Sequence, residues 1–208
     1  MTELDPDTGR SPYRRLSLWW DQLSEELAGP QRPALTADTE ADVAIVGAGF
    51  TGLWTAYYLL KADPSLRVVV LERETAGFGA SGRNGGWCSA LFPTPLAKVA
   101  ASSSREAAIA LAHAMNETID EVGRVVAAEG LDASFRKGGT VVLARSPLQM
   151  KRATEEVQDW AQWGFTSADH QLLDATGALD LVAATDVLGG TYTPHCAAIQ
   201  PARLVRGL

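Results

Sequence analysis

The chain has 208 residues, 46% of them hydrophobic and 21% charged, a balance typical of globular proteins with one sizeable core. Its formal net charge of −7 argues against nucleic-acid partners and anionic membranes, because both attract basic surfaces. No apolar run approaches the roughly 18–20 residues that span a bilayer, so no membrane span is predicted.

The cysteines and the N-terminus indicate the cell compartment. Cys88 and Cys196 are far apart in sequence and form no metal-type pair, so no metal site is predicted. The first ten residues, MTELDPDTGR, are acidic and polar, unlike a signal peptide. We therefore expect a reducing, cytoplasmic location.

Residues 1–40 are predicted to form an N-terminal extension. Residues 1–15 are polar and contain two prolines and a glycine, which favours a mobile tail. Four apolar residues then recur at i, i+4, i+7 and i+11 and predict an amphipathic helix: Leu16, Trp20, Leu23 and Leu27. The neighbouring pair Trp19 and Trp20 is also compatible with a membrane-interface anchor. Acidic residues nearby favour docking of this helix on the protein's own surface instead.

Residues 41–86 hold the strongest pattern in the chain. Val43–Val46 is a short, β-branched apolar run, typical of a fully buried parallel strand, and a helical apolar pattern follows it. Three glycines between them have G-x-G-x-x-G spacing: Gly47, Gly49 and Gly52. A second apolar run, residues 67–71, ends at Glu72, twenty positions after Gly52. Strand, glycine turn, helix, strand and acid together predict a Rossmann-like dinucleotide site.

Each glycine has a physical role in such a site. Gly47 permits the sharp turn out of the strand, Gly49 lets a pyrophosphate approach the backbone, and Gly52 lets the helix pack closely on the strand. The helix N-terminus offers backbone N–H groups and a partial positive charge to the phosphates, so its residues join the candidates: Ala48, Phe50 and Thr51.

Glu72 follows the second strand, where its carboxylate can accept hydrogen bonds from an adenosine ribose. A 2′-phosphate would be repelled there, so a non-phosphorylated dinucleotide is favoured over NADP. The structural alternative is a glycine-rich turn between strand and helix that binds no ligand.

Residues 77–86 bear on the choice between NAD and FAD. They read GFGASGRNGG, with five glycines in ten residues, and their backbone can press against a planar ligand. The segment also carries a hydroxyl, a guanidinium and an amide. An NAD enzyme normally continues directly into its next strand–helix unit, so this loop favours FAD.

The middle of the chain predicts helices and strands in alternation. Pro93 and Pro95 introduce a helical region. A long helix follows with seven apolar residues at helical spacing, and Gly130 closes it: Ala108, Leu111, Ala112, Met115, Ile119, Val122 and Val126. His113 falls on its polar side and is interpreted as a solvated residue. Residues 139–144 predict a strand, with Phe135 on a preceding one.

Ser146 and Pro147 cap and start another helix. Its Trp160, together with Trp163, suggests either an aromatic cage or a core contact, and their spacing favours the core. Residues 171–175 predict a short helical piece, and residues 187–192 a strand. Pro201 starts a last helix without a stop signal, so we expect the chain to be the amino-terminal portion of a longer protein.

Three of these segments resemble the FAD-dependent oxidoreductases of the D-amino-acid oxidase type, especially the gamma-glutamylputrescine oxidase-like branch. They read VAIVGAGFTGLWTAYYL, VVVLERE and GFGASGRNGG. The residues from His195 onward resemble a further element of that family, where a proline opens a helix that returns to the flavin domain. The likeness is strong over residues 41–95 and moderate over residues 185–208.

The resemblance implies individual roles. Gly47, Gly49 and Gly52 would hold the pyrophosphate, Glu72 would bind the adenosine ribose, and Arg73 would lie near the adenine. Two loop residues would approach the pyrophosphate and the ribityl chain, Ala80 and Ser81. Four more would lie along the isoalloxazine: Arg83, Asn84, Gly85 and Gly86.

Three of the candidate residues have alternative interpretations. Arg83 would stabilise negative charge on the reduced flavin, or would hydrogen-bond to loop carbonyls. Cys88 raises the question of covalent flavin, but a buried structural thiol is preferred. His195 is interpreted as structural before substrate-facing. No residue is nominated as catalytic.

The resemblance implies an α/β fold: a Rossmann-like FAD-binding domain with a parallel sheet, plus part of an interleaved α+β substrate domain. The expected segments are the extension, the first FAD-binding segment, part of the substrate domain and a return to the FAD-binding domain: residues 1–40, 41–130, 131–192 and 193–208.

The implied activity is oxidation of the carbon–nitrogen bond of an amine or amino acid, by hydride transfer to FAD. Oxygen or another acceptor would then reoxidise the flavin. One alternative is an NAD-dependent dehydrogenase. Another is a truncated, non-catalytic flavin-fold module that binds partners.

Overall fold

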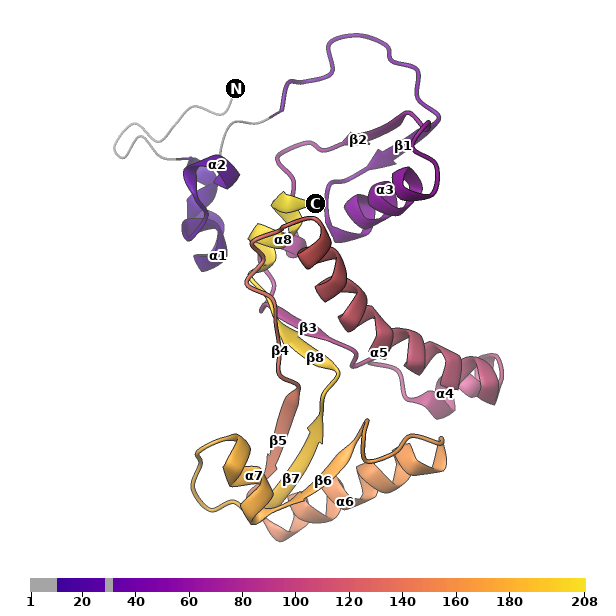
Figure 1. Cartoon of the computed structure of the whole chain (residues 1–208), viewed down its shortest axis with the longest axis vertical. Helices are drawn as coiled ribbons and strands as arrows, with labels where there is room; N and C mark the ends of the chain where they lie inside the picture. Colours follow the sequence, from indigo (N-terminus) through magenta and orange to yellow (C-terminus); the bar gives the residue numbers. More distant parts are fainter. Residues whose placement is uncertain (1–10, 29–31) are drawn as a thin grey trace. The chain divides into compact units, whose positions relative to one another are not determined.

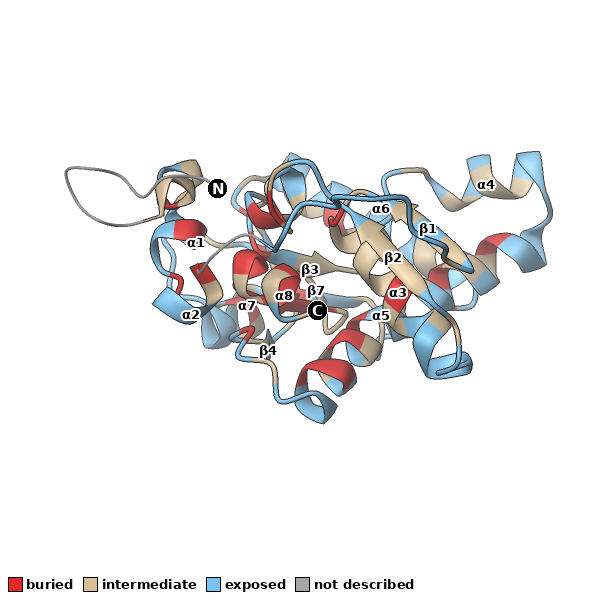
Figure 2. Cartoon of the chain, turned by 90° about the horizontal axis from the view of Figure 1, so that it is seen from above, coloured by how far each residue is buried: buried red, intermediate tan, exposed pale blue. Residues whose placement is uncertain are grey.

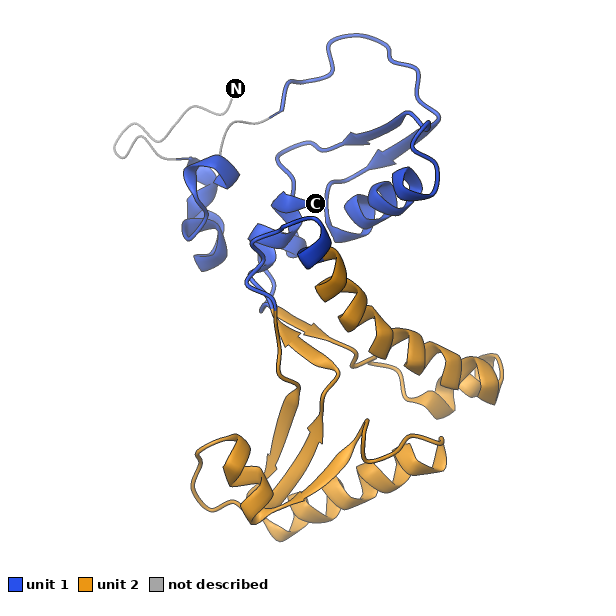
Figure 3. Cartoon of the chain, viewed as in Figure 1, with its two compact units in different colours: residues 1–86, 126–135, 199–208 blue, residues 87–125, 136–198 orange. Residues whose placement is uncertain are grey.

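The computed structural model describes residues 11–28 and 32–208 (Figure 1). The chain divides into two compact units (Figure 3): unit 1 comprises residues 1–86, 126–135 and 199–208, and unit 2 comprises residues 87–125 and 136–198. Neither unit coincides with one of the segments expected from the sequence. The division into FAD-binding and substrate-binding segments therefore stays a prediction.

Unit 1 contains the predicted strand–helix–strand. Strand β1, Val43–Val46, pairs in parallel with β2, Val68–Leu71, and helix α3, Phe50–Ala62, connects them. This arrangement confirms the parallel sheet and its crossover helix. Full burial of the strands was wrong, since the Val46 side chain is 88% exposed. The described sheet has two strands packed against one helix, so much of its surface stays open.

The N-terminal extension differs from the predicted single helix. The structure has three short helical segments: η1, Pro12–Leu16, α1, Leu18–Asp21, and α2, Glu25–Ala28. Ser17 interrupts them in an extended conformation, and its hydroxyl accepts a hydrogen bond from the backbone N–H of Trp20. The predicted docking is confirmed, because Trp20 and Leu23 are buried against Ala202. Most of the expected tail, residues 1–10, lies outside the described residues.

The last helix of unit 1, α8, begins at Pro201 as predicted and extends over Pro201–Gly207. The Gln200 side chain caps it by accepting a hydrogen bond from the backbone N–H of Arg203 at 2.7 Å. The backbone N–H of Gln200 in turn donates to the carbonyl of Ala133. Four residues of α8 are buried in unit 1: Pro201, Ala202, Leu204 and Val205.

Unit 2 contains two small antiparallel sheets and their helices. The first sheet has the order β3-β8-β4, formed by Trp87–Ser89, Cys196–Ala198 and Arg136–Lys137. The second has the order β5-β7-β6, formed by Thr140–Ala144, Gly189–Thr193 and Gln171–Asp174. The helices are α4, α6 and α7, and α5 up to Val125: Leu96–Ser102, Pro147–Gln162, Ala175–Leu181 and Arg105–Ala128. Residues 126–128 of α5 belong to unit 1. The strands predicted at residues 139–144 and 187–192 are thereby confirmed.

Helix α5 confirms the long apolar stripe. Five of its seven predicted residues are buried, and Leu111 and Met115 are half-buried. Figure 2 shows buried and exposed colours alternating along α5. Gly130, with φ of +64°, terminates the helical region as expected. No helix in the part of the chain that the structure describes is long and apolar enough to cross a membrane.

Of the predicted helical piece at residues 171–175, only Ala175 is helical. Residues 171–174 form strand β6 instead, in which Leu172 pairs with Thr191 and Leu173 pairs with Gly190. The helix α7 starts only after Asp174, whose carboxylate caps it by accepting from the backbone N–H of Gly177 at 2.8 Å. Pairing with β7, a distant partner in sequence, overrides the local pattern here.

The predicted packing role of Trp160 agrees with the aromatic cluster of unit 2. Its ring stacks on His170 with centroids 4.0 Å apart and meets Phe165 edge-on at 5.0 Å. Burial in this cluster lowers the pKa of His170 to about 4. His113, which was expected to be solvated, is exposed but also lies 4.9 Å from the Phe165 ring.

Candidate functional site

The glycine turn after β1 has the geometry that its sequence predicts. Gly47 has φ of +99°, and its N–H donates to the carbonyl of Leu71 at 2.7 Å. A Cβ on Gly47 would meet no atom within 4 Å, so the turn faces open space. A Cβ on Gly52 would lie 2.2 Å from the carbonyl oxygen of Gly47. Glycine is therefore required at position 47 by conformation and at position 52 by close packing.

The loop at residues 77–86 meets this turn. The backbone N–H of Phe50, the first residue of α3, donates to Ser81 Oγ at 2.9 Å, and the N–H of Gly77 donates to the carbonyl of Ala48 at 2.9 Å. A Cβ on Gly49 would lie 3.0 Å from the same hydroxyl oxygen. Ser81 therefore stands at the N-terminus of α3, and its own hydroxyl proton remains available to a phosphate oxygen.

Glu72 lies beside the turn, as predicted. Its Oε2 accepts from the backbone N–H of Ala48 at 2.9 Å, and its Oε1 accepts from the N–H of Glu74 at 3.0 Å. Burial alone would raise the pKa of the Glu72 carboxyl. The hydrogen bonds from Glu74, Ala48 and Arg73 outweigh it, so the pKa lies below its usual value. A carboxylate offers about four acceptor sites, so this side chain keeps capacity for ribose hydroxyls.

Arg73, the predicted neighbour of the adenine, lies on the surface. Its side chain is 87% exposed, and its Nε donates to the Glu74 carboxylate at 3.2 Å. A contact between Arg73 and an adenine stays a prediction.

The polar side chains of the loop hold the loop itself. Arg83 Nε donates to the carbonyl of Gly79 at 3.2 Å, and its guanidinium lies 5.5 Å from the Phe78 ring centroid. Asn84 Nδ2 donates to the carbonyls of Ser81 and Ala80, and its Oδ1 accepts from the N–H of Gly86 at 2.8 Å. The loop-stabilising interpretation of Arg83 therefore has a direct structural basis. A flavin contact by either side chain stays a prediction.

The loop is also fixed at both ends, by Val205 of α8 and by Ile199, two residues before α8. Gly77 has φ of +80°, and a Cβ there would lie 2.3 Å from Val205. Gly86 has φ of +71°, and its carbonyl accepts from the N–H of Ile199 at 2.9 Å. A Cβ added to Gly85 would meet no atom within 4 Å. The loop thus presents open backbone at Gly85 between two anchored ends.

Sequence reasoning missed three side chains that support this region. Trp19 Nε1 donates to the carbonyl of Asn84 at 2.7 Å, and Ser17 Oγ donates to the carbonyl of Gly82 at 3.2 Å. Arg206 donates to Thr75 Oγ1 at 2.7 Å. The adjacent tryptophans at positions 19 and 20 were the one signal available, but an apolar stripe does not reveal an indole hydrogen bond.

The structural interpretations of Cys88 and His195 stay predictions, and each residue has identifiable surroundings. Both cysteines are free, and burial raises the pKa of the Cys88 thiol, which disfavours a reactive thiolate. Cys88 pairs with Ala197 in the sheet, so its side chain and that of Cys196 point to opposite faces. His195 Nε2 lies 3.0 Å from Asp169 Oδ1, a pair that fits a structural role. No group of three or more metal-ligating side chains occurs among the described residues.

Comparison with known proteins gives a consistent result. The family model described as FAD dependent oxidoreductase matches residues 42–208. The chain is 32% identical over 174 residues to gamma-glutamylputrescine oxidoreductase of Escherichia coli (strain K12), covering 83% of this chain and 39% of that protein. It is 28% identical over 193 residues to the probable oxidoreductase OrdL of Haemophilus influenzae, covering 92% of this chain and 43% of that protein. The chain thus spans about two fifths of the length of these relatives.

Solved structures show the same fold. Glycine oxidase from Geobacillus kaustophilus aligns with a TM-score of 0.54 and 26% identity, over 80% of this chain and 42% of that chain. L-Amino acid deaminase from Proteus myxofaciens aligns with a TM-score of 0.64 and 18% identity, over 86% of this chain and 37% of that chain. The second likeness concerns the fold alone.

Proposed function

The chain belongs to the FAD-dependent oxidoreductase family, and on that premise we propose that it oxidises the carbon–nitrogen bond of a small amine or amino acid. When bound, FAD would accept a hydride from the carbon that bears the nitrogen, and water would hydrolyse the resulting imine to a carbonyl compound and an amine or ammonia. Molecular oxygen would restore the oxidised cofactor and leave hydrogen peroxide. The names of the similar enzymes support an amine or amino acid as substrate.

The meeting of the glycine turn and the loop is the observation that carries this proposal. The open space at Gly47 and the N-terminus of α3 fit a pyrophosphate, with Ser81 positioned to donate its proton. Glu72, ionised and held by backbone N–H groups, fits an adenosine ribose. In this proposal the residues of this chain bind and orient the cofactor. No described residue is named as the base that accepts a proton from the substrate. The NAD-dependent alternative lacks support, because the matching family uses FAD.

A spectral and turnover experiment on the full-length protein tests the proposal. We expect the purified protein to show the visible absorbance of bound flavin, and one member of an amine and amino-acid panel to bleach it without air. The same substrate should produce hydrogen peroxide in air. A protein that lacks flavin but binds NADH would contradict the proposal, as would a flavoprotein that no amine or amino acid reduces. Reduction by a substrate with electrons passed only to a dye would contradict oxygen as the acceptor.

The free thiols of Cys88 and Cys196 support a reducing, cytoplasmic location, which we include in the proposal.

Replacing Glu72 by glutamine is expected to raise the Kd for FAD about tenfold, because a neutral amide accepts weaker hydrogen bonds than a carboxylate. The pKa of the Glu72 carboxyl is lower in the folded protein than in the unfolded chain, so the ionised group stabilises the fold at pH values above the usual carboxyl pKa. This stabilisation is lost as the pH falls through the lowered pKa of the folded protein. Fluorescence titration of FAD at pH 7 measures the change in affinity. The matched control is Glu155→Gln, which makes the same change at an exposed carboxylate of unit 2 that pairs with Lys151. Equal affinities in the two variants would contradict the role of Glu72.

A further inference from the structure

The N-terminal strap, defined here as residues 12–28, supplies hydrogen-bond donors to the loop at residues 77–86. Ser17 Oγ donates to the carbonyl of Gly82 at 3.2 Å, and Trp19 Nε1 donates to the carbonyl of Asn84 at 2.7 Å. Each donor precedes its acceptor by 65 positions in the chain. Two carbonyls of the candidate flavin loop are therefore satisfied by a segment outside the Rossmann-like pattern.

Aromatic side chains of the strap also fit against the loop. The Trp20 side chain is 1% exposed, and a Cβ on Gly82 would lie 2.7 Å from its Nε1. A Cβ on Gly86 would lie 3.3 Å from the Trp19 ring. The rings of Tyr13 and Phe78 meet edge-on, with centroids 6.1 Å apart. Two of the loop glycines are thus positions where the strap approaches the backbone closely.

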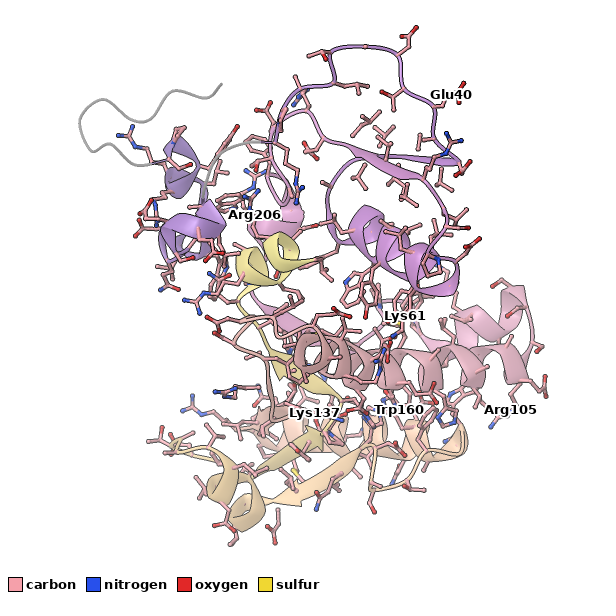
Figure 4. The ribbon with its side chains drawn as sticks, turned by 45° about the horizontal axis from the view of Figure 1, so that its top comes forward. Glu40, Lys61, Arg105, Lys137, Trp160 and Arg206 are labelled. Carbon is pink, nitrogen blue, oxygen red and sulfur yellow. The ribbon has the colours of Figure 1, made fainter. Side chains whose placement is uncertain are left out.

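The strap is itself fastened to α8 and the residue before it. Gln200 Nε2 donates to the carbonyl of Trp19 at 2.7 Å. Arg206, labelled in Figure 4, donates from Nε to the carbonyl of Leu27 at 2.8 Å and from its terminal nitrogen to Thr75. Its guanidinium also lies 5.8 Å from the Trp20 ring. The strap is therefore held in place by Gln200 and Arg206 while it contacts the loop.

A glycine-rich loop has a large conformational entropy, and ordering it upon ligand binding lowers the affinity. If only a fraction of the molecules hold the loop in the binding conformation, the apparent Kd rises by the inverse of that fraction. Contacts that already order the loop in the free protein remove this cost. On this basis, and resting on the proposed function, we propose that Ser17 and Trp19 are positioning residues that hold residues 77–86 in the conformation that binds FAD.

The test compares the wild-type full-length protein with Trp19→Phe and Ser17→Ala. Trp19→Phe keeps an aromatic ring but removes the indole N–H, and Ser17→Ala removes the hydroxyl donor. Trp163→Phe is the matched control, because it makes the same chemical change where the ring stacks on Arg105 in unit 2. Two quantities are measured well below the melting temperature: the Kd for FAD by fluorescence titration, and amide hydrogen exchange of residues 77–86 without FAD.

We expect each strap variant to raise the Kd about fivefold, the equivalent of one hydrogen bond of about 1 kcal/mol. Exchange should accelerate in residues 77–86 and stay unchanged in β5 and β7, and the control should match the wild type in both measurements. A Kd unchanged in both strap variants would overturn the proposal, as would an equal rise in the control. A purely structural role would instead speed exchange across unit 1 without a selective effect on the loop.

Failure of the proposed function gives a different result. A wild-type protein that binds no FAD would contradict the cofactor assignment itself. Exchange in the FAD-free protein still decides whether the strap orders the loop, and unchanged exchange in both strap variants would then overturn the strap's role as well.

Discussion

Replacing Gly49 by valine is expected to abolish FAD binding, raising the Kd at least a thousandfold, which corresponds to about 4 kcal/mol. Gly49 is the N-cap of α3, where a pyrophosphate would approach the backbone. A Cβ there would already lie 3.0 Å from Ser81 Oγ, and the two methyl groups of valine would extend further. They would fill the space of the phosphates or displace the hydroxyl that bonds to Phe50.

The fold should tolerate this change, because the nearest obstacle is the end of a side chain that can rotate. We expect the FAD-free Gly49→Val protein to melt within a few degrees of the FAD-free wild type. Visible absorbance after purification and fluorescence titration measure cofactor binding. Gly138→Val is the control, since a Cβ on Gly138 meets no atom within 4 Å. A Gly49→Val protein that keeps its flavin through gel filtration would contradict the position of the site.

The strand–turn–helix–strand was predictable because its determinants are local. Glycine spacing, the β-branched runs around it and the acid after the second strand all lie within about thirty residues. The structure accordingly has Gly47 at positive φ and Gly52 in close packing. The contact between Glu72 and the turn follows from the parallel pairing of β1 and β2, which the pattern also encodes.

The errors concern segments whose conformation depends on distant partners. Ser17 breaks the expected N-terminal helix, and its hydroxyl donates to Gly82, 65 positions later. Helical periodicity over residues 16–27 is compatible with three short segments that bury Trp20 and Leu23 and pack Leu16 and Leu27 against them. Residues 171–174 likewise become a strand through pairing with β7. Neither partner is visible in a short window of sequence.

The loop shows the same limit at the level of side chains. A hydroxyl, a guanidinium and an amide in a glycine-rich segment predict ligand contacts, but such groups also satisfy nearby backbone carbonyls. Arg83 and Asn84 bond to carbonyls three or four positions away. Ser81 bonds across 31 positions to the start of α3. Residue type alone predicts that these side chains are important, but not which group each one contacts.

Replacing Gly52 by alanine should lower the stability of the fold, which Gly49→Val should leave nearly unchanged. The reason is that the new methyl group would meet backbone atoms, which cannot rotate away as the Ser81 side chain can. The added Cβ would lie 2.2 Å from the carbonyl oxygen of Gly47 and 3.1 Å from Ile45 Cγ2. The helix must then move away from β1, at a cost of about 3 kcal/mol for overpacking. Alanine recovers up to about 1 kcal/mol of helix propensity, so the net loss in the free energy of unfolding is about 2 kcal/mol or more.

Thermal and denaturant unfolding of the FAD-free proteins measures this loss and separates the two glycines. Gly52→Ala should lower the stability of the protein before any cofactor is added, whereas Gly49→Val should not. Gly138→Ala makes the same chemical change in open space and should remain within about 0.5 kcal/mol of the wild type. If Gly52→Ala is as stable as Gly138→Ala, α3 does not depend on close contact with the turn. In that case close packing of α3 on the turn does not require glycine at position 52, and contact with a bound ligand would have to require it instead.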